Sequence, residues 1–293
     1  MTELDASEFR SLITSVFPHL TGAVFKLAAK GWDSIAVDVD DTLIFKFPRD
    51  LSAERALRKE AALLGVVRPS LSMAVPDMRI HEGPPFFSSH TKIEGEHLIT
   101  EDYEALGEGD RRRLADDLAR FYAELHVIEA DRMHEAGAGA IQPWQSPEAV
   151  RTKALPLLPP EIRRFAQRVV SDFEILPPDP YGNIYGFFDG HGWNMAFDHG
   201  QKRLNGIYDF ADSGFGPLHQ EFIYSNFISP DLTARIVSAY ESLTGRRLDR
   251  RRIAILTGFH RLSELAELAD DPANVEQMVR SAAAWAAIAA RAD

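Results

Sequence analysis

A carboxylate and an amide with the spacing needed for phosphoryl transfer lie in the second half of the chain. The segment DGHGWN runs from Asp189 to Asn194, and Asp209 follows within GIYDFADSG. Phosphoryl transfer needs a carboxylate that orients the acceptor hydroxyl and oxygen ligands that hold Mg²⁺ against the donor phosphates. A loop followed by a hairpin would return Asp209 to the first two residues. We expect a catalytic site here, although each residue taken alone could simply cap a turn.

A lysine and a glutamate in the first quarter of the chain fit the same chemistry. Lys46 lies in the apolar run IFKFP, and Glu60 follows in LRKEAALL. A lysine within an apolar strand either extends toward water or meets a partner. In kinase-type enzymes such a lysine binds the donor phosphates and is held by a helix glutamate. Taken by themselves, these two residues would more simply be an edge-strand lysine and an exposed glutamate. The order along the chain of Lys, Glu, Asp-x4-Asn and Asp favours a lysine paired with the glutamate.

The elements that must position these residues form two groups, of which the first is rich in strands. Residues 34–47 are typical of a β-hairpin with an Asp-Asp-Thr turn, and residues 52–64 of a helix with Ser52 at its N-cap. Two further short strands are expected around MAVP (73–76) and FFSSHTKIEG (86–95), separated by the turn-rich HEGPP.

From Gly109 onward the pattern becomes helical. Residues 110–130 place five apolar side chains on one face: Leu114, Leu118, Phe121, Leu125 and Ile128. Strand-like residues at 183–216 include MAF and LNGIYDF around a polar turn. Further helices are expected at about 147–155, 160–174, 219–228, 231–244, 249–269 and 272–291.

This distribution predicts an α+β fold of two lobes. The small β-rich lobe comprises residues 1–95, and the larger, mainly helical lobe comprises residues 96–293. A cleft between two lobes is a common place for a ligand. We therefore expect the nucleotide-binding groups on the first lobe and the catalytic loop with the substrate site on the second.

The composition limits both the partners and the chemistry. Of 293 residues, 45% are hydrophobic and 26% charged, as in globular proteins. Lys and Arg number 32 and Asp and Glu 44, so the net charge is −12, which repels nucleic acid and anionic membranes and attracts cations. The absence of cysteine excludes disulfides, thiolate nucleophiles and Cys-ligated metals.

The chain also lacks the sequence signals of membrane insertion and secretion. No apolar run approaches the roughly 20 residues of a membrane-spanning helix, and the acidic start MTELDASEFR is unlike a secretory signal. We expect a cytoplasmic protein that binds neither nucleic acid nor membrane. The sequence leaves the oligomeric state open.

The segments described above resemble the aminoglycoside phosphotransferase family, which has a protein-kinase-like fold. The resemblance covers roughly residues 25–270 and rests on GWDSIAVDVDDTLIFKFP, LRKEAALL, TKIEGEHL, LARFYAELHVIEA, DGHGWNMAF and GIYDFADSGFGPLHQEF. It implies that Lys46 binds the donor phosphates with Glu60 as its partner, that Asp189 is the catalytic base, and that Asn194 and Asp209 bind Mg²⁺.

The same resemblance implies where the rest of the nucleotide would bind and what the enzyme would do. The backbone near Thr91 to Ile93 would hydrogen-bond the purine, and Ser34 would face the phosphates. The implied enzyme transfers the γ-phosphate of ATP or GTP to a hydroxyl of a small acceptor. The family name does not fix that acceptor: an aminoglycoside-like cation, and with it a role in antibiotic resistance, is one candidate.

Three side chains are candidates for acceptor binding. His191 lies inside the catalytic loop, and Glu264 and Glu267 lie three residues apart in RLSELAELADDP, on one face of an expected helix. Carboxylates bind ammonium groups through charge-assisted hydrogen bonds, which would suit a cationic acceptor. A solvated helix face in an acidic protein is the alternative for the two glutamates.

The chain departs from the family pattern at four places. Phe187 and Phe188 stand where the family usually has His-Gly before the catalytic Asp, so a supporting histidine contact is missing. The segment 216–218 reads Gly-Pro-Leu where Gly-Asp-Pro is common. Glu221 takes the place of a buried Asp that braces the loop. The glycine-rich loop over the nucleotide is also weak, so its location is inferred from position alone.

Two other functions remain to be weighed. The run AVDVDDTLI matches the signature of haloacid dehalogenase-like phosphatases, with Asp38 as nucleophile and Asp40 as acid/base. That fold needs a loop and a helix after the motif and alternating strands and helices, whereas this run continues into a strand. A non-catalytic nucleotide-binding kinase-like protein is the second alternative. His126, on an apolar helix face, is expected to be a packed core histidine.

Overall fold

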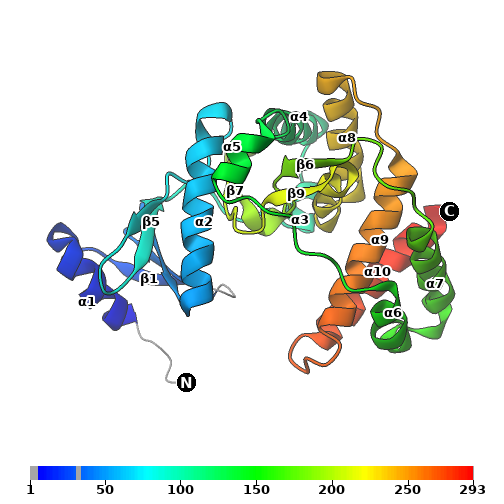
Figure 1. Ribbon diagram of the computed structural model, residues 1–293, viewed down its shortest axis with the longest axis horizontal. Helices are drawn as coiled ribbons and strands as arrows, with labels where there is room; N and C mark the ends of the chain where they lie inside the picture. Colours follow the sequence, from blue (N-terminus) through cyan, green and yellow to red (C-terminus); the bar gives the residue numbers. More distant parts are fainter. Residues whose placement is uncertain (1–5, 31–33, 293) are drawn as a thin grey trace.

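The computed structural model describes residues 6–30 and 34–292. Figure 1 shows the sheet with helices α1 and α2 at one end of an elongated molecule and the helical body at the other. The α+β, two-lobed fold predicted from the sequence is confirmed. The lobe boundary that we propose, between residues 95 and 96, lies in the segment that leads from the last strand of the sheet to the first helix of the body.

The five-stranded sheet of the first lobe has the order β1-β2-β3-β5-β4, with every neighbouring pair antiparallel. The predicted hairpin is confirmed as β2 and β3. Its turn contains Asp40 and Asp41 at φ of 53° and 57°, a left-handed conformation that aspartate tolerates better than most residues. The strands are β1 (Phe25–Lys30), β2 (Ser34–Val39), β3 (Leu43–Pro48), β4 (Arg79–His81) and β5 (Phe87–Thr91).

The register of the hairpin separates two faces of this sheet. Ala36 lies opposite Lys46 and Val37 opposite Phe45, and side chains alternate between faces along a strand. One face carries Ala36 and Lys46. The other face buries Val37 and Phe45 in an apolar cluster that α1 (Ala6–Val16) completes with Phe9 and other side chains. The face that carries Lys46 therefore points toward α2 and the second lobe.

The N-cap of helix α2 (Leu51–Val67) lies two residues earlier than the sequence predicted. The N-cap is Asp50, whose carboxylate accepts hydrogen bonds from the backbone N–H groups of Ser52 and Ala53. The prediction of Ser52 as N-cap is wrong, because the extended backbone of Asp50 lets its side chain reach those two amides, while Ser52 is already within the first turn. The helix buries one face that includes Glu60.

The strand predicted around MAVP is also wrong. Residues 73–76 form no strand, and Ala74 makes only an isolated bridge, in which its carbonyl accepts a hydrogen bond from Ile207 of the second lobe. Pro76 has no backbone N–H to offer to a strand ladder. The segment instead ties the two lobes together, and the strand that pairs with β5 lies further on, at β4.

The second lobe consists mainly of helices at the positions that the hydrophobic periodicity predicted. The helix expected at 110–130 ends at Leu125, so Ile128 lies beyond it. The helices are α3 (Thr100–Glu104), α4 (Glu108–Leu125), α5 (Ala130–Glu135), α6 (Pro147–Ala149) with the π and 3₁₀ turns Val150–Ala154 and Leu155–Leu157, α7 (Pro160–Glu174), the 3₁₀ helices Leu218–Phe222 and Tyr224–Phe227, α8 (Pro230–Thr244), α9 (Arg250–Glu267) and α10 (Val275–Ala292).

Two small antiparallel ladders within this lobe hold the loops that carry Asp189 and Asp209. Strand β7 (Met195–Asp198) pairs with β8 (Arg203–Ile207), as the sequence predicted, and β6 (Asn183–Gly186) pairs with β9 (Gly214–Pro217). The loop 187–194 therefore runs between β6 and β7, and the loop 208–213 between β8 and β9. Within residues 6–30 and 34–292, no helix combines the length and apolar character that crossing a bilayer requires.

Candidate functional site

Lys46, Glu60 and Asp209 come together between the two lobes. The ammonium nitrogen of Lys46 lies 3.3 Å from both carboxylate oxygens of Glu60 and 3.7 Å from Oδ1 of Asp209. Glu60 is buried and also accepts a hydrogen bond of 3.1 Å from the backbone N–H of Phe210. The sheet, helix α2 and the loop after β8 thus meet at one carboxylate.

The electrostatics of this group keep the lysine charged. Burial disfavours the charged ammonium form of Lys46. The attraction of the Glu60 and Asp209 carboxylates is larger than this effect of burial and raises the pKa of Lys46 above its ordinary value. Lys59, the next residue on α2, donates to the carbonyl groups of Ala211 and Ser213 at 3.4 Å each. Helix α2 is therefore fastened to the loop that carries Asp209 at two adjacent residues.

The loop between β6 and β7 holds Asp189, His191 and Asn194 in mutual contact. The amide nitrogen of Asn194 donates to the Asp189 carboxylate at 2.7 Å and to its backbone carbonyl at 3.0 Å. His191 Nε2 lies 3.0 Å from the other carboxylate oxygen of Asp189. The carbonyl of Asn194 accepts a hydrogen bond from the backbone of Tyr208, the residue before Asp209. This bond connects the two loops.

The residues present fit a magnesium ion that arrives with a nucleotide. Because its Nδ2 is bound to Asp189, Asn194 keeps its Oδ1 as an oxygen ligand, and no hydrogen bond among the described residues uses that oxygen. Asp209 supplies a carboxylate nearby. In the part of the chain that the structure describes, no group of three His, Asp or Glu side chains could hold a metal by itself. Mg²⁺ commonly takes one or two protein oxygens and completes its shell with phosphates and water.

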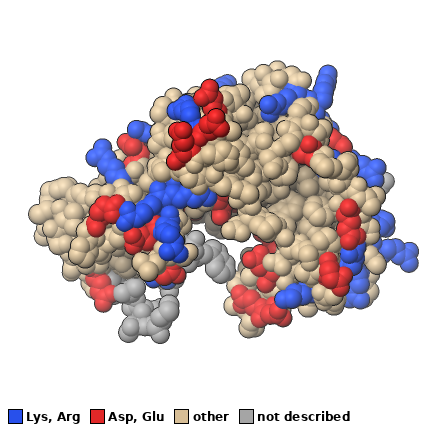
Figure 2. Space-filling view, in the orientation of Figure 1, with Lys and Arg blue, Asp and Glu red and all other residues tan. Residues whose placement is uncertain are grey.

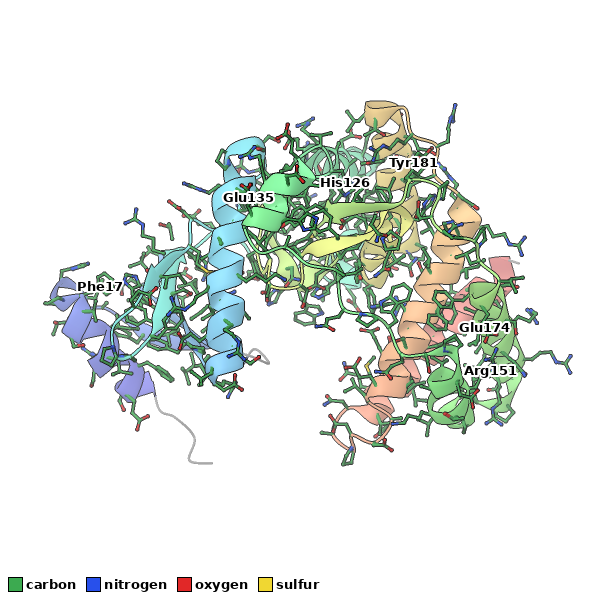
Figure 3. All side chains as sticks on the ribbon, viewed as in Figure 1. Phe17, His126, Glu135, Arg151, Glu174 and Tyr181 are labelled. Carbon is green, nitrogen blue, oxygen red and sulfur yellow. The ribbon has the colours of Figure 1, made fainter. Side chains whose placement is uncertain are left out.

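Glu221 supports the loop between β6 and β7 from the protein interior. Its carboxylate is fully buried and accepts hydrogen bonds from the backbone N–H groups of Phe187 at 2.8 Å and Phe188 at 2.9 Å. His126 Nε2 lies 3.2 Å from the same carboxylate, and its Nδ1 lies 2.9 Å from the Tyr240 hydroxyl. Both expectations for this region are confirmed: Glu221 braces the loop, and His126 is packed inside the helical body (Figure 3).

The two phenylalanines that replace the usual His-Gly are buried. The Phe187 ring lies 4.8 Å from that of Phe210 and 5.8 Å from that of Phe121, so it fills space between the loop and α4 without a polar contact. Phe188 has a φ of 54°, a left-handed conformation that is costly for a bulky residue. The two bonds to Glu221 hold the backbone there.

A pocket of about 270 Å³ opens beside Asp189. Helix α9 contributes His260, Glu264 and Glu267 at positions i, i+4 and i+7 to its lining. Neither lysine nor arginine lines it, which favours a cationic ligand. The remaining lining residues are Ile141, Gln142, Pro143, Trp144, Phe188, Asp212, Gln220, Tyr224 and Ser263.

Two polar groups of this pocket have unusual protonation behaviour. Burial raises the pKa of Glu264 to about 7, in spite of the Arg261 and His191 charges that oppose the rise. Burial and the charge of Arg261 lower the pKa of His260 to about 3, so its ring is neutral. Glu264 Oε2 and His260 Nδ1 are buried 3.6 Å from each other, beyond hydrogen-bond distance, and neither atom has a hydrogen-bond partner among the described residues. Unpaired buried polar atoms are uncommon and suit a site that a ligand completes.

Among the described residues, no hydrogen bond or ion pair joins the predicted base-binding and phosphate-facing residues to Lys46, Glu60 or Asp209. Ser34 is the first residue of β2 and shares the sheet face of Lys46, while residues 31–33 before it lie outside the described part. The Thr91 carbonyl accepts a hydrogen bond from the His90 ring, and Lys92 donates its N–H to Thr42. No hydrogen bond among the described residues uses the Ile93 N–H.

The acidic residues of the phosphatase alternative are engaged elsewhere. Asp38 lies within β2, where it accepts hydrogen bonds from Lys92 at 2.6 Å and from the N–H of Asp41. Asp40 lies in the hairpin turn and accepts from the N–H of Val24. The named strands of the described residues pair only in antiparallel fashion. The doubly wound parallel sheet that this alternative requires is absent from residues 6–30 and 34–292, and the alternative is wrong.

Sequence reasoning missed part of the pocket. Trp144, Tyr224 and His260 line it from three segments far apart in the chain. The i, i+4, i+7 spacing of His260 with the two glutamates was a usable signal, but nothing local marked the two aromatic residues. Figure 2 shows the surface hollowed between the lobes, with acidic side chains gathered on the helical lobe beside the hollow.

Comparison with known proteins places these features in a family. The model of the phosphotransferase enzyme family matches residues 24–256. The fold is similar to that of the wild-type aminoglycoside 2'-phosphotransferase-IIIa in its GDP complex, with a TM-score of 0.83 and 19% identity over 97% of this chain and 99% of that chain.

Two further solved structures share the fold. One is the ternary complex of APH(2'')-IIa with streptomycin and ATP, with a TM-score of 0.66 and 19% identity over 96% of this chain and 97% of that one. The other is a macrolide 2'-phosphotransferase type I, with a TM-score of 0.67 and 19% identity over 97% and 98% of the two chains. At this identity the likeness concerns the fold.

Proposed function

The chain belongs to the phosphotransferase enzyme family, and from this premise we propose that it is a small-molecule kinase that transfers the γ-phosphate of ATP or GTP to a hydroxyl of a small cationic acceptor. One observation carries the proposal. The contacts among Lys46, Glu60 and Asp209 and those among Asp189, Asn194 and Tyr208 join into one site. An acidic pocket adjoins that site at Asp189.

Each of these side chains has a role that its contacts support. Lys46, kept charged by Glu60, binds donor phosphate oxygens. Mg²⁺, held by Asn194 and Asp209, would supply positive charge to the donor phosphates. Asp189 accepts the proton of the acceptor hydroxyl. The hydroxyl oxygen bonds to the γ-phosphorus as the bond between that phosphorus and the oxygen bridging to the β-phosphate breaks. The nucleoside diphosphate leaves with that bridging oxygen.

The donor and the acceptor class are the finer parts of the proposal. Solved structures of this fold include complexes with GDP and with ATP, and one of them contains streptomycin. In this chain the free Ile93 N–H suits a purine, and the pocket beside Asp189 is lined by Glu264 and Glu267 and by neither lysine nor arginine. A compound with both a hydroxyl and an ammonium group would satisfy that lining.

The test measures nucleotide binding and turnover separately. We expect Mg-ATP or Mg-GTP to raise the melting temperature, because a ligand at 100 times its Kd stabilises the native state by about 2.7 kcal/mol. We then expect phosphate transfer to at least one member of a panel of kanamycin, streptomycin, gentamicin, a macrolide and small amino alcohols. Binding of neither nucleotide would overturn the proposal. Binding without transfer to any of these acceptors would favour the non-catalytic nucleotide-binding protein.

The pocket also predicts how acceptor binding depends on pH. With a pKa of about 7, Glu264 is neutral below that pH and ionised above it, and only the carboxylate attracts an ammonium group. For an acceptor whose amine stays protonated, we expect the acceptor KM to fall by about tenfold between pH 6 and pH 8. Steady-state kinetics at constant ionic strength would measure this.

The control for this pH effect is Glu264→Gln, which keeps the size of the side chain and removes its titration. The variant should bind the acceptor weakly at every pH. A wild-type acceptor KM that does not change between pH 6 and pH 8, or a Glu264→Gln variant that keeps the wild-type change, would contradict the prediction.

A further inference from the structure

Both oxygens of the Asp189 carboxylate are held by side chains of its own loop. Asn194 donates to Oδ2 at 2.7 Å, and His191 Nε2 lies 3.0 Å from Oδ1. A carboxylate only accepts hydrogen bonds, so Nε2 must carry the proton in this contact. The ring therefore keeps Nε2 beside Asp189 whether or not Nδ1 is protonated.

The backbone around His191 leaves its side chain little choice of position. It lies between Gly190 and Gly192, and neither of these positions has room for a side chain. A Cβ at Gly190 would overlap the Tyr122 hydroxyl, and one at Gly192 would overlap the carbonyl oxygen of Leu98. The His191 N–H also donates to the Asp189 carbonyl at 2.9 Å. Tight packing on both sides thus fixes the backbone position from which the imidazole reaches Asp189.

The ion-pair contact of 3.0 Å with Asp189 is the only polar side-chain contact of the imidazole within the described residues. His191 Nδ1 is buried and unpartnered, and the ring is mostly covered, with 27% of the side chain exposed. The charges of Glu264 on α9 and of Asp209 after β8 act on the ring without a direct hydrogen bond. A histidine that served the packing of the loop would be expected to have a second partner, as His126 does.

The residues before Asp189 provide no such polar support. Phe187 and Phe188 present apolar rings to their surroundings, and their backbone N–H groups are bound to Glu221. The orientation of the Asp189 carboxylate therefore depends on groups that follow it in the chain. In the proposed function, Asn194 is also a ligand of the metal. His191 is then the side chain whose only task is to hold Asp189.

We propose that His191 is a positioning residue for catalysis, which fixes the rotation of the Asp189 carboxylate through Nε2 so that it can accept the proton of the acceptor hydroxyl. The inference rests on the proposed function, because it gives His191 a task only if Asp189 is the base. Without the contact, Asn194 alone restrains the rotation of the carboxylate about its last bond. Misplacement of a reacting group by about 1 Å costs on the order of 100-fold in rate.

The experiment compares two variants of similar size that differ in the donor. His191→Leu removes it, and His191→Gln supplies an amide N–H in place of Nε2. With Mg-ATP or Mg-GTP and the acceptor found in the panel, we expect His191→Leu to lower kcat by about 10- to 100-fold, with the nucleotide KM and the Kd of Mg-ADP within about twofold of wild type. His191→Gln should recover most of the lost kcat.

A matched control is His199→Ala, which removes an exposed histidine bound only to the His97 carbonyl. Its kcat should equal that of wild type, and the melting temperatures of all variants should be compared before the kinetics. Because both His191 variants keep the size of the side chain, a loop disturbed by packing would affect them equally, whereas a lost donor affects only His191→Leu.

The possible results separate the inference from the proposed function. An unchanged kcat in His191→Leu, a loss equal in His191→Leu and His191→Gln, or a loss confined to KM would overturn the inference while wild-type transfer upholds the proposed function. If wild type transfers phosphate to no acceptor, the proposed function fails and the role of His191 fails with it.

Discussion

Replacing Asp189 by Asn is expected to lower kcat for phosphoryl transfer by about 10²- to 10⁴-fold, the usual range for loss of a general base. The amide keeps the size of the carboxylate and an oxygen for Asn194, but it cannot accept the proton of the acceptor hydroxyl. Lys46, Glu60 and Asp209 remain in contact with one another, so nucleotide affinity should stay close to that of wild type. Initial-rate kinetics and calorimetric titration with Mg-ADP would measure the two quantities.

The control for this variant is Asp172→Asn on the outer side of α7, where the carboxylate makes only a weak pair with Arg251 at 3.7 Å. It should leave kcat unchanged. A kcat for Asp189→Asn within about threefold of wild type would show that Asp189 is not the base and would remove the central residue of the proposed mechanism.

Replacing Glu221 by Ala is expected to lower the free energy of unfolding by about 3–5 kcal/mol, because it removes a buried charge on which several groups depend. The N–H groups of Phe187 and Phe188 and the His126 ring would lose their common acceptor in a site without solvent. The left-handed backbone of Phe188 would also lose its support. Urea denaturation followed by circular dichroism would measure the loss.

The matched control is Glu276→Ala, which removes an exposed glutamate paired with Arg280 at i, i+4 on α10. Exposed pairs of this kind contribute about 0.3–0.5 kcal/mol, so this variant should remain within that range of wild type. If Glu221→Ala unfolded at the wild-type urea concentration, the catalytic loop would have to be held by some other contact.

Much of the fold could be predicted from local pattern. The hairpin of β2 and β3 follows from two β-rich runs around an Asp-Asp-Thr turn, and α7 lies at 160–174 as the periodicity predicted. The errors lie where a local signal had two solutions. Asp50 and Ser52 can both cap a helix, and MAVP has strand propensity but contains a proline. Backbone conformation and contacts with the second lobe decided these cases.

Part of the site could be predicted as well, because the order of residue types reflects the chemistry. The Lys46 to Glu60 pair and the contact of Asp189 with Asn194 are present as the sequence suggested. Whether Glu264 and Glu267 face solvent or a ligand could not be decided from helical spacing. They line a pocket only because the 141–144 segment and the 3₁₀ helix of Tyr224 pack against α9.

The sequence by itself determined the two-lobed α+β organisation, the acidic charge and the residue types of a phosphoryl-transfer site. These depend on composition and on patterns that repeat within a single strand, helix or loop. The tertiary structure decided which carboxylates are buried, that Glu264 titrates near neutrality, and that His191 contacts Asp189. Burial and hydrogen bonding arise from segments distant in the chain, and the pKa of a carboxyl depends on those surroundings.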